Sequence, residues 1–357
     1  MTDRSSPKGL LAVPATMLAA VLRGPNDLVL EQMDVPRPGP GELLVRIRVC
    51  GICGSDLMDW YVAQKAPFVF GHEPAGDVVA VGDGVTRFRP GDRVVLHHHA
   101  PCMECEACRR GDYVHCPVWR EQALLPGGMA EYAVVAQQSV RHDTHLLPAH
   151  VSYEAGTLVE PLACVVKALK RARFAPGMRV LVIGLGFIGQ LFGFLLRRRG
   201  AGRLAGSDAV SRRLALAREH WADEVYDVSR PPAAPRLTSA VPEQAFDLVV
   251  VTPGSPKAML EGIKYVRSGG TLLLFAPAAP GETVPFPVEE LFFREVNIVT
   301  SYSAGPDDMK EALEHVVSGH VPADVLITHR FPLHQAEAAY RTARDVHNSL
   351  KVVVTMD

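Results

Sequence analysis

A glycine-rich turn between a strand-like and a helix-like segment constrains the fold of this 357-residue chain more than any other feature. The apolar run MRVLVIG leads into the turn GLGFIG, and the helical pattern QLFGFLLRRR follows it. In this context the first glycine of G-x-G-x-x-G forms the tight turn, the second admits a pyrophosphate, and the third lets the helix pack closely on the strand. The segment therefore predicts a dinucleotide-binding domain, with contacts from Gly184, Gly186, Phe187, Ile188 and Gly189.

The next strand-like segment, RLAGSD, ends in the carboxylate of Asp208. A carboxylate at the end of the second strand of such a domain accepts hydrogen bonds from the ribose hydroxyls of NAD. Its charge would repel the 2′-phosphate of NADP, so the sequence favours NAD. Arg212 and Arg213 lie close by and are able to pair with that phosphate, which keeps NADP as the less favoured alternative. Arg213 is counted among the cofactor contacts.

Strand and helix patterns alternate through the rest of the second half. DEVYDV, FDLVVVT, GGTLLLFAP and VNIVTSYS read as strands, and SPKAMLEGIKYV as a helix, which predicts a doubly wound parallel sheet. The proline-rich segment RPPAAPRLTSAVPEQ predicts a surface loop. The tail contains a helix (PDDMKEALEHVVSGH), a strand (LITHRF), a second helix (LHQAEAAYRTARD) and a last strand (LKVVVTM), and we expect it to fold back onto the first half.

The first half is rich in short strands separated by Gly-Asp and Pro-Gly turns, as in GDVVAVGDGV and GDRVVLHHH. This pattern predicts a barrel-like unit rather than strand–helix repeats. The chain is therefore expected to be an α/β protein of two domains. We expect a disordered leader at 1–16, a catalytic domain at 17–168 joined by 305–357, and the dinucleotide domain at 169–304.

Composition excludes several classes of function. The 37 basic and 39 acidic residues nearly balance, so no electrostatic feature favours nucleic acid. No run approaches the length of a membrane span, and the N-terminus lacks the pattern of a signal peptide. Four of the seven cysteines are clustered, which suits metal ligation in a reducing cytoplasm better than disulfides.

That cluster lies in APCMECEACRRGDYVHC and has the spacing C-x2-C-x2-C-x7-C. Closely spaced thiolates can surround one ion tetrahedrally, and a closed shell of four sulfurs leaves no position for a substrate. The spacing predicts a structural zinc site, with a four-cysteine iron–sulfur cluster as the main competitor. Its ligands would be Cys102, Cys105, Cys108 and Cys116.

A second set of potential ligands lies in CGICGSDLMDWYVAQKAPFVFGHE. Cys53, His72 and Glu73 offer sulfur, nitrogen and oxygen, all of which suit zinc. Asp56 could accept from the other ring nitrogen of a ligating imidazole and so orient it. The alternative is a buried thiol acting as a small hydrophobic group beside a polar pair in a loop. Glu160, just before Pro161, has a similar alternative as a solvated carboxylate at a helix start.

Taken together, these motifs resemble the zinc-containing medium-chain alcohol dehydrogenases, most closely their sorbitol (polyol) and threonine dehydrogenase branch. The resemblance covers nearly all of 17–357. It rests on GICGSD, GHEPAG, PGDRV, the four clustered cysteines, VEPLAC and GLGFIG. It implies a GroES-like catalytic domain and a Rossmann domain, a soluble cytoplasmic enzyme, and a homodimer or homotetramer.

The resemblance also implies two zinc ions per chain and assigns roles to residues. Cys53, His72 and a carboxylate would hold a catalytic zinc, and Glu73 and Glu160 both remain open as that carboxylate. Ser55 would take the proton of an alcohol whose hydride passes to NAD. Some branches have a second cysteine ligand, but that place falls on Ala163, and Cys164 is one residue away.

The chain departs from the family pattern in two places. A relay histidine common in relatives is replaced by Met58, and the neighbouring Asp59 is an alternative proton shuttle. The run His97–His99 is also unusual, and local packing and hydrogen bonding are favoured for it over ligation or substrate contact. Trp60 and Tyr61 could line a pocket or simply pack.

The motif set favours a secondary alcohol bearing further hydroxyls, such as a sugar alcohol or cyclitol, as the small-molecule partner. Dehydrogenases of simple or amino alcohols form one alternative. A zinc-stabilised dinucleotide-binding protein without catalysis forms another, and the presence of both Cys53 and His72 speaks against it.

Overall fold

The computed structural model describes residues 13–121, 123–229 and 245–356. Its contacts divide the chain into two compact units. Unit 1 comprises 1–160, 327–344 and 351–357, and unit 2 comprises 161–326 and 345–350. The predicted proline-rich loop and most of the predicted leader lie outside the described residues.

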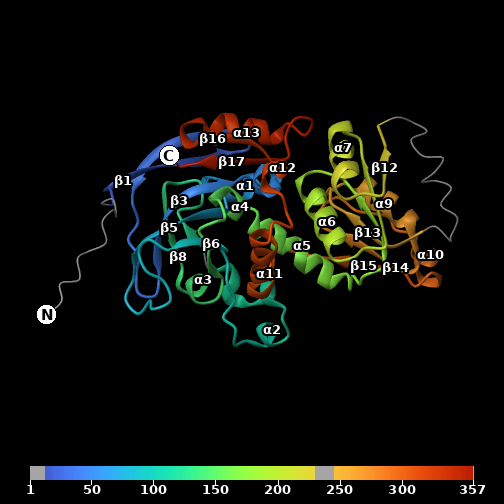
Figure 1. Ribbon diagram of the computed structural model, residues 1–357, viewed down its shortest axis with the longest axis horizontal. Helices are drawn as coiled ribbons and strands as arrows, with labels where there is room; N and C mark the ends of the chain where they lie inside the picture. Colours follow the sequence, from blue (N-terminus) through green and yellow to red (C-terminus); the bar gives the residue numbers. More distant parts are fainter. Residues whose placement is uncertain (1–12, 122, 230–244, 357) are drawn as a thin grey trace. The chain divides into compact units, whose positions relative to one another are not determined.

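Unit 1 is built mainly from antiparallel strands, as its short alternating segments predicted (Figure 1). One sheet has the order β2-β1-β4, with β1 at Thr16–Gly24, β2 at Asp27–Asp34 and β4 at Phe68–Val69. A larger sheet has the order β16-β17-β3-β5-β6-β9, and β8 joins β3 and β7 beside it. These strands are β3 (Leu43–Gly51), β5 (Glu73–Val81), β6 (Arg93–Leu96), β7 (Leu124–Leu125), β8 (Tyr132–Val135), β9 (Thr144–Leu146), β16 (Ile327–Pro332) and β17 (Lys351–Thr355).

The C-terminal strand completes the larger sheet because β17 pairs antiparallel with β3, with Val353 opposite Gly51. Helix α13 (Ala336–Arg344) runs along β16 and β17 and buries Ala336, Ala339 and Tyr340 (Figure 1). The expected return of this part of the tail to the first half is thus observed. The shorter helices in the described part of unit 1 are η1 (Gly54–Leu57), α1 (Asp59–Lys65), α2 (Glu106–Arg109), η2 (Tyr113–His115), η3 (Pro117–Arg120), α3 (Gln137–His142), α4 (Tyr153–Gly156) and η6 (Leu333–Gln335).

Unit 2 contains a six-stranded parallel sheet with the order β12-β11-β10-β13-β14-β15. This is the order of the doubly wound dinucleotide fold, as predicted. Its strands are β10 (Arg179–Ile183), β11 (Arg203–Asp208), β12 (Glu224–Asp227), β13 (Phe246–Val251), β14 (Val266–Leu274) and β15 (Asn297–Thr300). Buried valines and leucines dominate the central strands because helices cover both faces of such a sheet.

The helices in the described part of unit 2 are α5 (Val159–Arg171, which begins in unit 1), α6 (Phe187–Arg198), α7 (Ser211–His220), α9 (Pro256–Gly262), η5 (Ile263–Tyr265), α10 (Val288–Phe293), α11 (Pro306–Val317) and α12 (Ala323–Leu326). None of the helices in the described ranges is both long and apolar enough to cross a membrane.

The unit boundaries differ from the predicted ones at 168 and 305. The division falls after Glu160, and α11 belongs to unit 2 rather than to the returning tail. Lys170 of α5 explains the difference, because its ammonium lies 2.7 Å from Asp308 and 3.0 Å from Glu311 of α11. The sequence pattern identified α11 as amphipathic but could not show which helix it pairs with.

Candidate active site

Cys53, His72 and Glu73 come together at one end of the larger sheet in unit 1. Cys53 precedes η1, just after β3, whereas His72 and Glu73 lie at the start of β5. The pairing of Gly51 with Glu73 aligns these two chain segments. A sulfur, a nitrogen and a carboxylate oxygen of the three residues all lie within 4.8 Å of one another. The structure thus brings together three of the predicted ligands.

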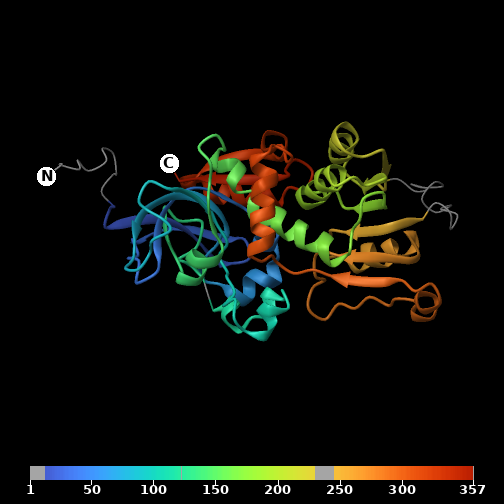
Figure 2. The same ribbon diagram turned by 60° about the horizontal axis from the view of Figure 1, so that its bottom comes forward.

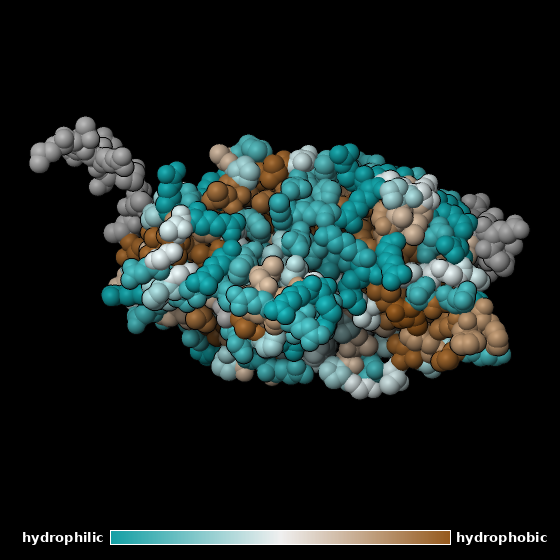
Figure 3. All heavy atoms as spheres, turned by 90° about the horizontal axis from the view of Figure 1, so that it is seen from below, coloured by the Kyte–Doolittle hydropathy of each residue, from teal (hydrophilic) through white to brown (hydrophobic). Residues whose placement is uncertain are grey.

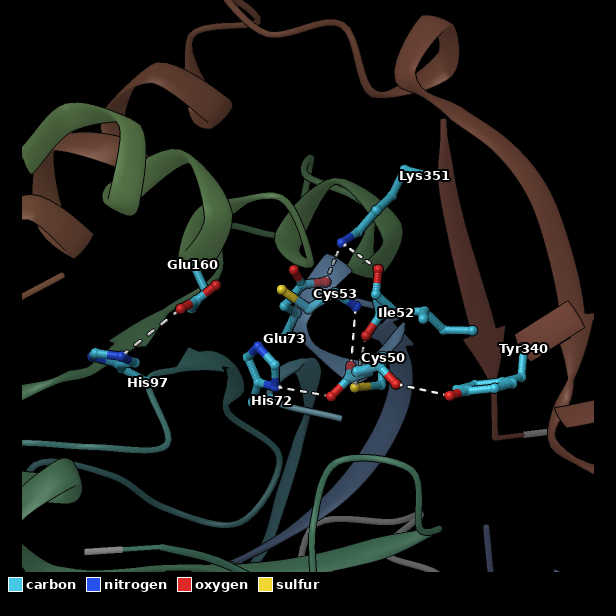
Figure 4. A network of polar contacts seen from close by, with 11 residues as sticks. Cys50, Ile52, Cys53, His72, Glu73, His97, Glu160, Tyr340 and Lys351 are labelled. Carbon is cyan, nitrogen blue, oxygen red and sulfur yellow. Dashed lines mark hydrogen bonds and ion pairs between the residues drawn. The ribbon is translucent and has the colours of Figure 1, made fainter. Parts of the chain in front are cut away.

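Glu73 has one paired and one unpaired oxygen. Its Oε2 accepts from the ammonium of Lys351, which also donates to the carbonyl of Ile52 at 3.0 Å (Figure 4). Both charged side chains are 1% exposed. The other oxygen, Oε1, is buried without a hydrogen-bond partner. A buried acceptor without a partner is costly, so this atom suits a cation. Together with the thiol and imidazole it forms a donor set that fits zinc.

Gly51 makes room for that ion pair. A Cβ at this position would lie 2.1 Å from Glu73 Oε2 and 2.7 Å from Lys351 Cε. Any larger residue at this position would therefore separate the carboxylate from the ammonium.

Asp56 supports both His72 and Cys53. It is 3% exposed, and its Oδ1 lies 3.6 Å from His72 Nδ1, an ion-pair distance. Its Oδ2 accepts from the backbone N–H of Cys53 at 3.1 Å, and the hydroxyl of Tyr340 donates to its carbonyl at 2.9 Å. This placement puts Asp56 beside the imidazole that it was predicted to orient.

The charges around His72 alter its protonation. Burial lowers the pKa of His72, but Asp56, Cys53 and Glu160 outweigh burial and raise the pKa well above its ordinary value. For Asp56, burial raises the pKa, and the nearby His72 acts in the opposite direction. Acidic groups therefore gather around this imidazole.

Glu160 belongs to a different group from Glu73. It is the second residue of α5 and forms a set with His97 and His98, whose ligand atoms lie within 4.8 Å of one another. Figure 4 shows Glu160 directed at His97, whereas Glu73 faces Lys351. Burial raises the pKa of Glu160, and His72 and His97 oppose this rise. The sequence left Glu73 and Glu160 open as ligands, and the structure separates them by their neighbours.

The remaining predicted residues near this site differ in their surroundings. Ser55 is half-buried in η1. Asp59, the alternative proton shuttle, has a side chain 57% exposed and accepts from Arg344 at 2.9 Å. Trp60 and Tyr61 contact each other edge to face, with ring centroids 5.6 Å apart. Ala163 is fully buried.

The four clustered cysteines form a compact lobe around α2, drawn in teal in Figure 2. Cys105 and Cys108 have sulfurs 3.5 Å apart, and those of Cys102 and Cys108 are 3.9 Å apart. Tetrahedral zinc with Zn–S bonds of about 2.3 Å holds its sulfurs about 3.8 Å apart. Backbone N–H donors, above all that of Glu104, lower the pKa of Cys102 to about 6, whereas burial raises that of Cys108 to about 12. The geometry fits a four-sulfur site.

The three consecutive histidines connect this lobe with His72. The ring of His98 lies 4.9 Å from that of His72 and 4.0 Å from that of His99, measured between centroids. The ring of His99 lies 4.2 Å from that of Trp119, which is fully buried in the lobe. We call these four rings the ring column. His98 and His99 thus pack between His72 and the lobe.

The glycine turn of unit 2 has the backbone that a dinucleotide requires. Gly184 has φ of +84°, which favours glycine, and accepts no Cβ because Thr252 Oγ1 would lie 2.6 Å away. A Cβ on Gly189 would lie 2.0 Å from the carbonyl oxygen of Gly184. Gly186 caps α6, whose first residues are Phe187 and Ile188. The free N–H groups of that helix end suit a pyrophosphate.

Asp208 ends β11 and is 8% exposed. Its oxygens accept from the backbone N–H groups of Leu185 at 2.6 Å and Val210 at 2.8 Å. Each oxygen retains a second lone pair for a ribose hydroxyl. Arg213 lies 3.6 Å from Asp208, and its Nε is buried without a hydrogen-bond partner. Arg212 instead donates to the carbonyl of Asn348 at 2.8 Å.

Comparisons with known proteins agree with both units. The alcohol dehydrogenase GroES-like domain matches residues 39–149, and the zinc-binding dehydrogenase domain matches 188–318. The chain is 34% identical to a sorbitol dehydrogenase of Bombyx mori over 91% of this chain and 95% of that protein. This chain belongs to the zinc-containing alcohol dehydrogenase family. Its motifs and relatives place it in the sorbitol (polyol) branch, and it is a dehydrogenase.

Two further relatives extend the comparison. A D-arabinitol dehydrogenase of Uromyces fabae is 32% identical over 92% of this chain and 94% of that protein. A crystal structure of a zinc-binding dehydrogenase from Sinorhizobium meliloti 1021, bound to NADP, has a TM-score of 0.85 at 26% identity. It covers 96% of this chain and 100% of that chain.

Sequence reasoning missed three residues around the site of this dehydrogenase. Lys351 is the most informative, since a cation inside the apolar run LKVVVTM signals a buried ion pair. Asp143, which contacts His97, and Tyr340, which contacts Asp56, gave no comparable signal. Their partners lie far away in the sequence, and only the fold brings them together.

Proposed function

We propose that this dehydrogenase transfers hydride between a secondary alcohol of the polyol class and NAD, with a catalytic zinc held by Cys53, His72 and Glu73. The observation that carries the proposal is the unpaired, buried Oε1 of Glu73 beside a thiol and an imidazole. The substrate class is supported by relatives named sorbitol and arabinitol dehydrogenase.

A zinc ion held by these residues would lower the pKa of an alcohol hydroxyl, and a bound nicotinamide would take up the hydride. The residues of the chain hold this arrangement in place. Asp56 lies beside the ring of His72, and the buried ammonium of Lys351 holds one oxygen of Glu73 in place. Ser55 is the proposed acceptor of the alcohol proton. We propose a second, structural zinc in the four-cysteine lobe, which gives two zinc ions for these two roles.

The preference for NAD over NADP rests on Asp208. Its buried carboxylate lies where a 2′-phosphate would bring a second negative group. Arg213 would weaken the repulsion between Asp208 and a 2′-phosphate, because its guanidinium lies beside the same carboxylate. One similar solved structure holds NADP and another holds NADH, so the activities of this chain with the two cofactors must be measured.

The test combines metal content with a substrate panel. The purified protein is expected to contain zinc at the Cys53 group as well as in the lobe. It should reduce NAD with polyols or cyclitols in preference to simple and amino alcohols, measured by NADH absorbance. Zinc in the lobe alone, with no turnover of any alcohol, would support the non-catalytic alternative.

We further propose that the enzyme acts in the cytoplasm as a homodimer or homotetramer. The cysteines are free thiols that form no disulfides, which suits a reducing compartment. An association surface is suggested by α10 and the edge strand β15, where Figure 3 shows hydrophobic surface on unit 2. Phe292 is 74% exposed, Phe293 76% and Ile298 40%. Light scattering of wild type and Phe293→Asp would test this, since a surviving oligomer in the variant would exclude the surface.

A further inference from the structure

The histidine run contains two buried ring nitrogens without hydrogen-bond partners, Nε2 of His97 and Nδ1 of His98. The two histidines belong to a group in which His97, His98 and Glu160 each place one ligand atom within 4.8 Å of the others. His97 comes directly after β6, and Glu160 lies at the start of α5. This group shares no residue with that of Cys53, His72 and Glu73.

His97 has the geometry of a metal-binding histidine. Its side chain is completely buried, and its Nδ1 lies 2.9 Å from Asp143 Oδ2. An ionised carboxylate can only accept, so the proton lies on Nδ1 and the lone pair of Nε2 is available. A carboxylate behind the ring fixes the tautomer and orientation of metal-bound histidines in the same way. Asp143 is itself held by His145, whose Nε2 lies 3.2 Å from Oδ1.

The free nitrogen of His97 faces Glu160 at a distance that leaves room between them. Nε2 lies 3.9 Å from Glu160 Oε1, which is too long for a hydrogen bond. Two ligands about 2.1 Å from a tetrahedral ion lie about 3.4 Å apart, so the gap has room for a cation. Two buried carboxylates, Asp143 and Glu160, flank this imidazole, and a divalent cation would balance their charges.

We propose that His97, His98 and Glu160 bind a further divalent metal ion, beside the catalytic zinc and distinct from the structural one. Two imidazoles and one carboxylate form the ligand set of zinc and of other first-row metals, with positions left open for water or substrate. The ring of His98 contacts that of His72, so the new site borders the Cys53 group. An alcohol bearing several hydroxyls could therefore reach both ions, which adds to the proposed function but does not depend on it.

The experiment measures metal content and ligand type in the full-length protein. Zinc is quantified per chain in wild type and in His97→Ala, Glu160→Gln and Cys53→Ser, each equilibrated with the same free zinc. Wild type should bind one ion more than the catalytic and structural sites require. His97→Ala and Glu160→Gln should each lose that ion alone, whereas Cys53→Ser should lose a different one. Glu160→Gln preserves side-chain volume and so keeps the test valid if His97→Ala fails to fold.

Cobalt substitution distinguishes the sites by their ligands. The proposed site has no thiolate, so cobalt bound there should add ligand-field absorption without a thiolate-to-cobalt charge-transfer band. Cobalt at the Cys53 group or in the lobe should show that band. His99→Ala is the control from the same histidine run and should retain the metal content of wild type.

Two results would overturn the proposal. One is a wild type with only the catalytic and structural ions, which would leave His97 and Glu160 as an imidazole–carboxylate pair. The other is loss of the same ion from Glu160→Gln and Cys53→Ser, which would assign Glu160 to the catalytic zinc. Failure of the proposed function would appear separately, as a Cys53→Ser variant with unchanged turnover.

Discussion

The four-cysteine lobe and the Cys53 group differ in how the chain assembles them. The lobe takes all its ligands from one short segment, with sulfurs already near tetrahedral spacing. The Cys53 group takes its ligands from two segments and its supporting charges from Asp56 and Lys351. A closed shell of local ligands suits stability, whereas an open set with one unpaired oxygen suits chemistry. Three changes test this difference, and a fourth tests the cofactor site of unit 2.

The largest effect is expected from Cys105→Ser. Metal binding energy is folding energy at a closed site, about 10–16 kcal/mol in zinc-finger peptides, and part of it would be lost. The variant should aggregate or melt at least about 10 °C lower, as several kcal/mol predict for domains of this size. Calorimetry of the variant beside Cys164→Ser, a thiol outside the lobe, checks this. An unchanged melting temperature after loss of the lobe metal would contradict the structural role.

Cys53→Ser should behave in the opposite way. Removal of the thiolate takes away the ion that supplies several kcal/mol to the reaction, so turnover should fall at least about a thousandfold. Melting temperature and NAD affinity should stay close to those of wild type, since the glycine turn lies in unit 2. Steady-state kinetics and calorimetric titration of NAD test both parts. Near-native turnover without metal at this site would show that the group is not catalytic.

Lys351→Met sharpens the contrast between the two sites. It leaves the buried carboxylate of Glu73 without its partner, which costs about 3–5 kcal/mol in comparable cases. A bound cation would offset part of this cost, so the loss should be smaller with zinc than after chelation. Urea denaturation with and without chelator measures the difference. The double variant Lys351→Met/Glu73→Gln should recover stability, and failure to do so would assign the loss to packing instead.

The smallest effect concerns unit 2. Two negative groups near Asp208 would repel by about 1–4 kcal/mol, so wild type should prefer NAD at least about tenfold in kcat/KM. Asp208→Ser should reduce or reverse the preference for NAD over NADP, because Arg213 could then pair with the 2′-phosphate. Arg212→Ser serves as the control, since Arg212 contacts Asn348. If wild type preferred NADP, Asp208 would not be the residue that discriminates against NADP.

The sequence predicted those features that depend on neighbours along the chain. The cysteine spacing, the glycine turn and the strand–helix alternation all act over short distances, and each is found where it was expected. The pairing of Lys351 with Glu73 and that of His97 with Asp143 join distant segments. No periodicity encodes such pairs, because they follow from the register of β3 with β5 and β17 and from the packing around β6.

The same limit explains the two carboxylates that the sequence left open. Glu73 and Glu160 occur in equally suggestive motifs, and their roles differ only through what surrounds them. A lysine faces one and a histidine the other. The boundary after Glu160 shows a similar effect, because α5 is continuous in sequence pattern although its first residues belong to unit 1.

The ring column places a fluorescent residue, Trp119, in contact with the histidines beside the site. Trp119 touches His99 at one end of the column, and His72 stands at the other end beside Cys53. Indole emission is sensitive to nearby imidazoles, so the fluorescence of this buried tryptophan should respond to occupancy at either end. Metal exchange could then be followed in real time without a label, provided that Trp60 and Trp221 are replaced to isolate the signal.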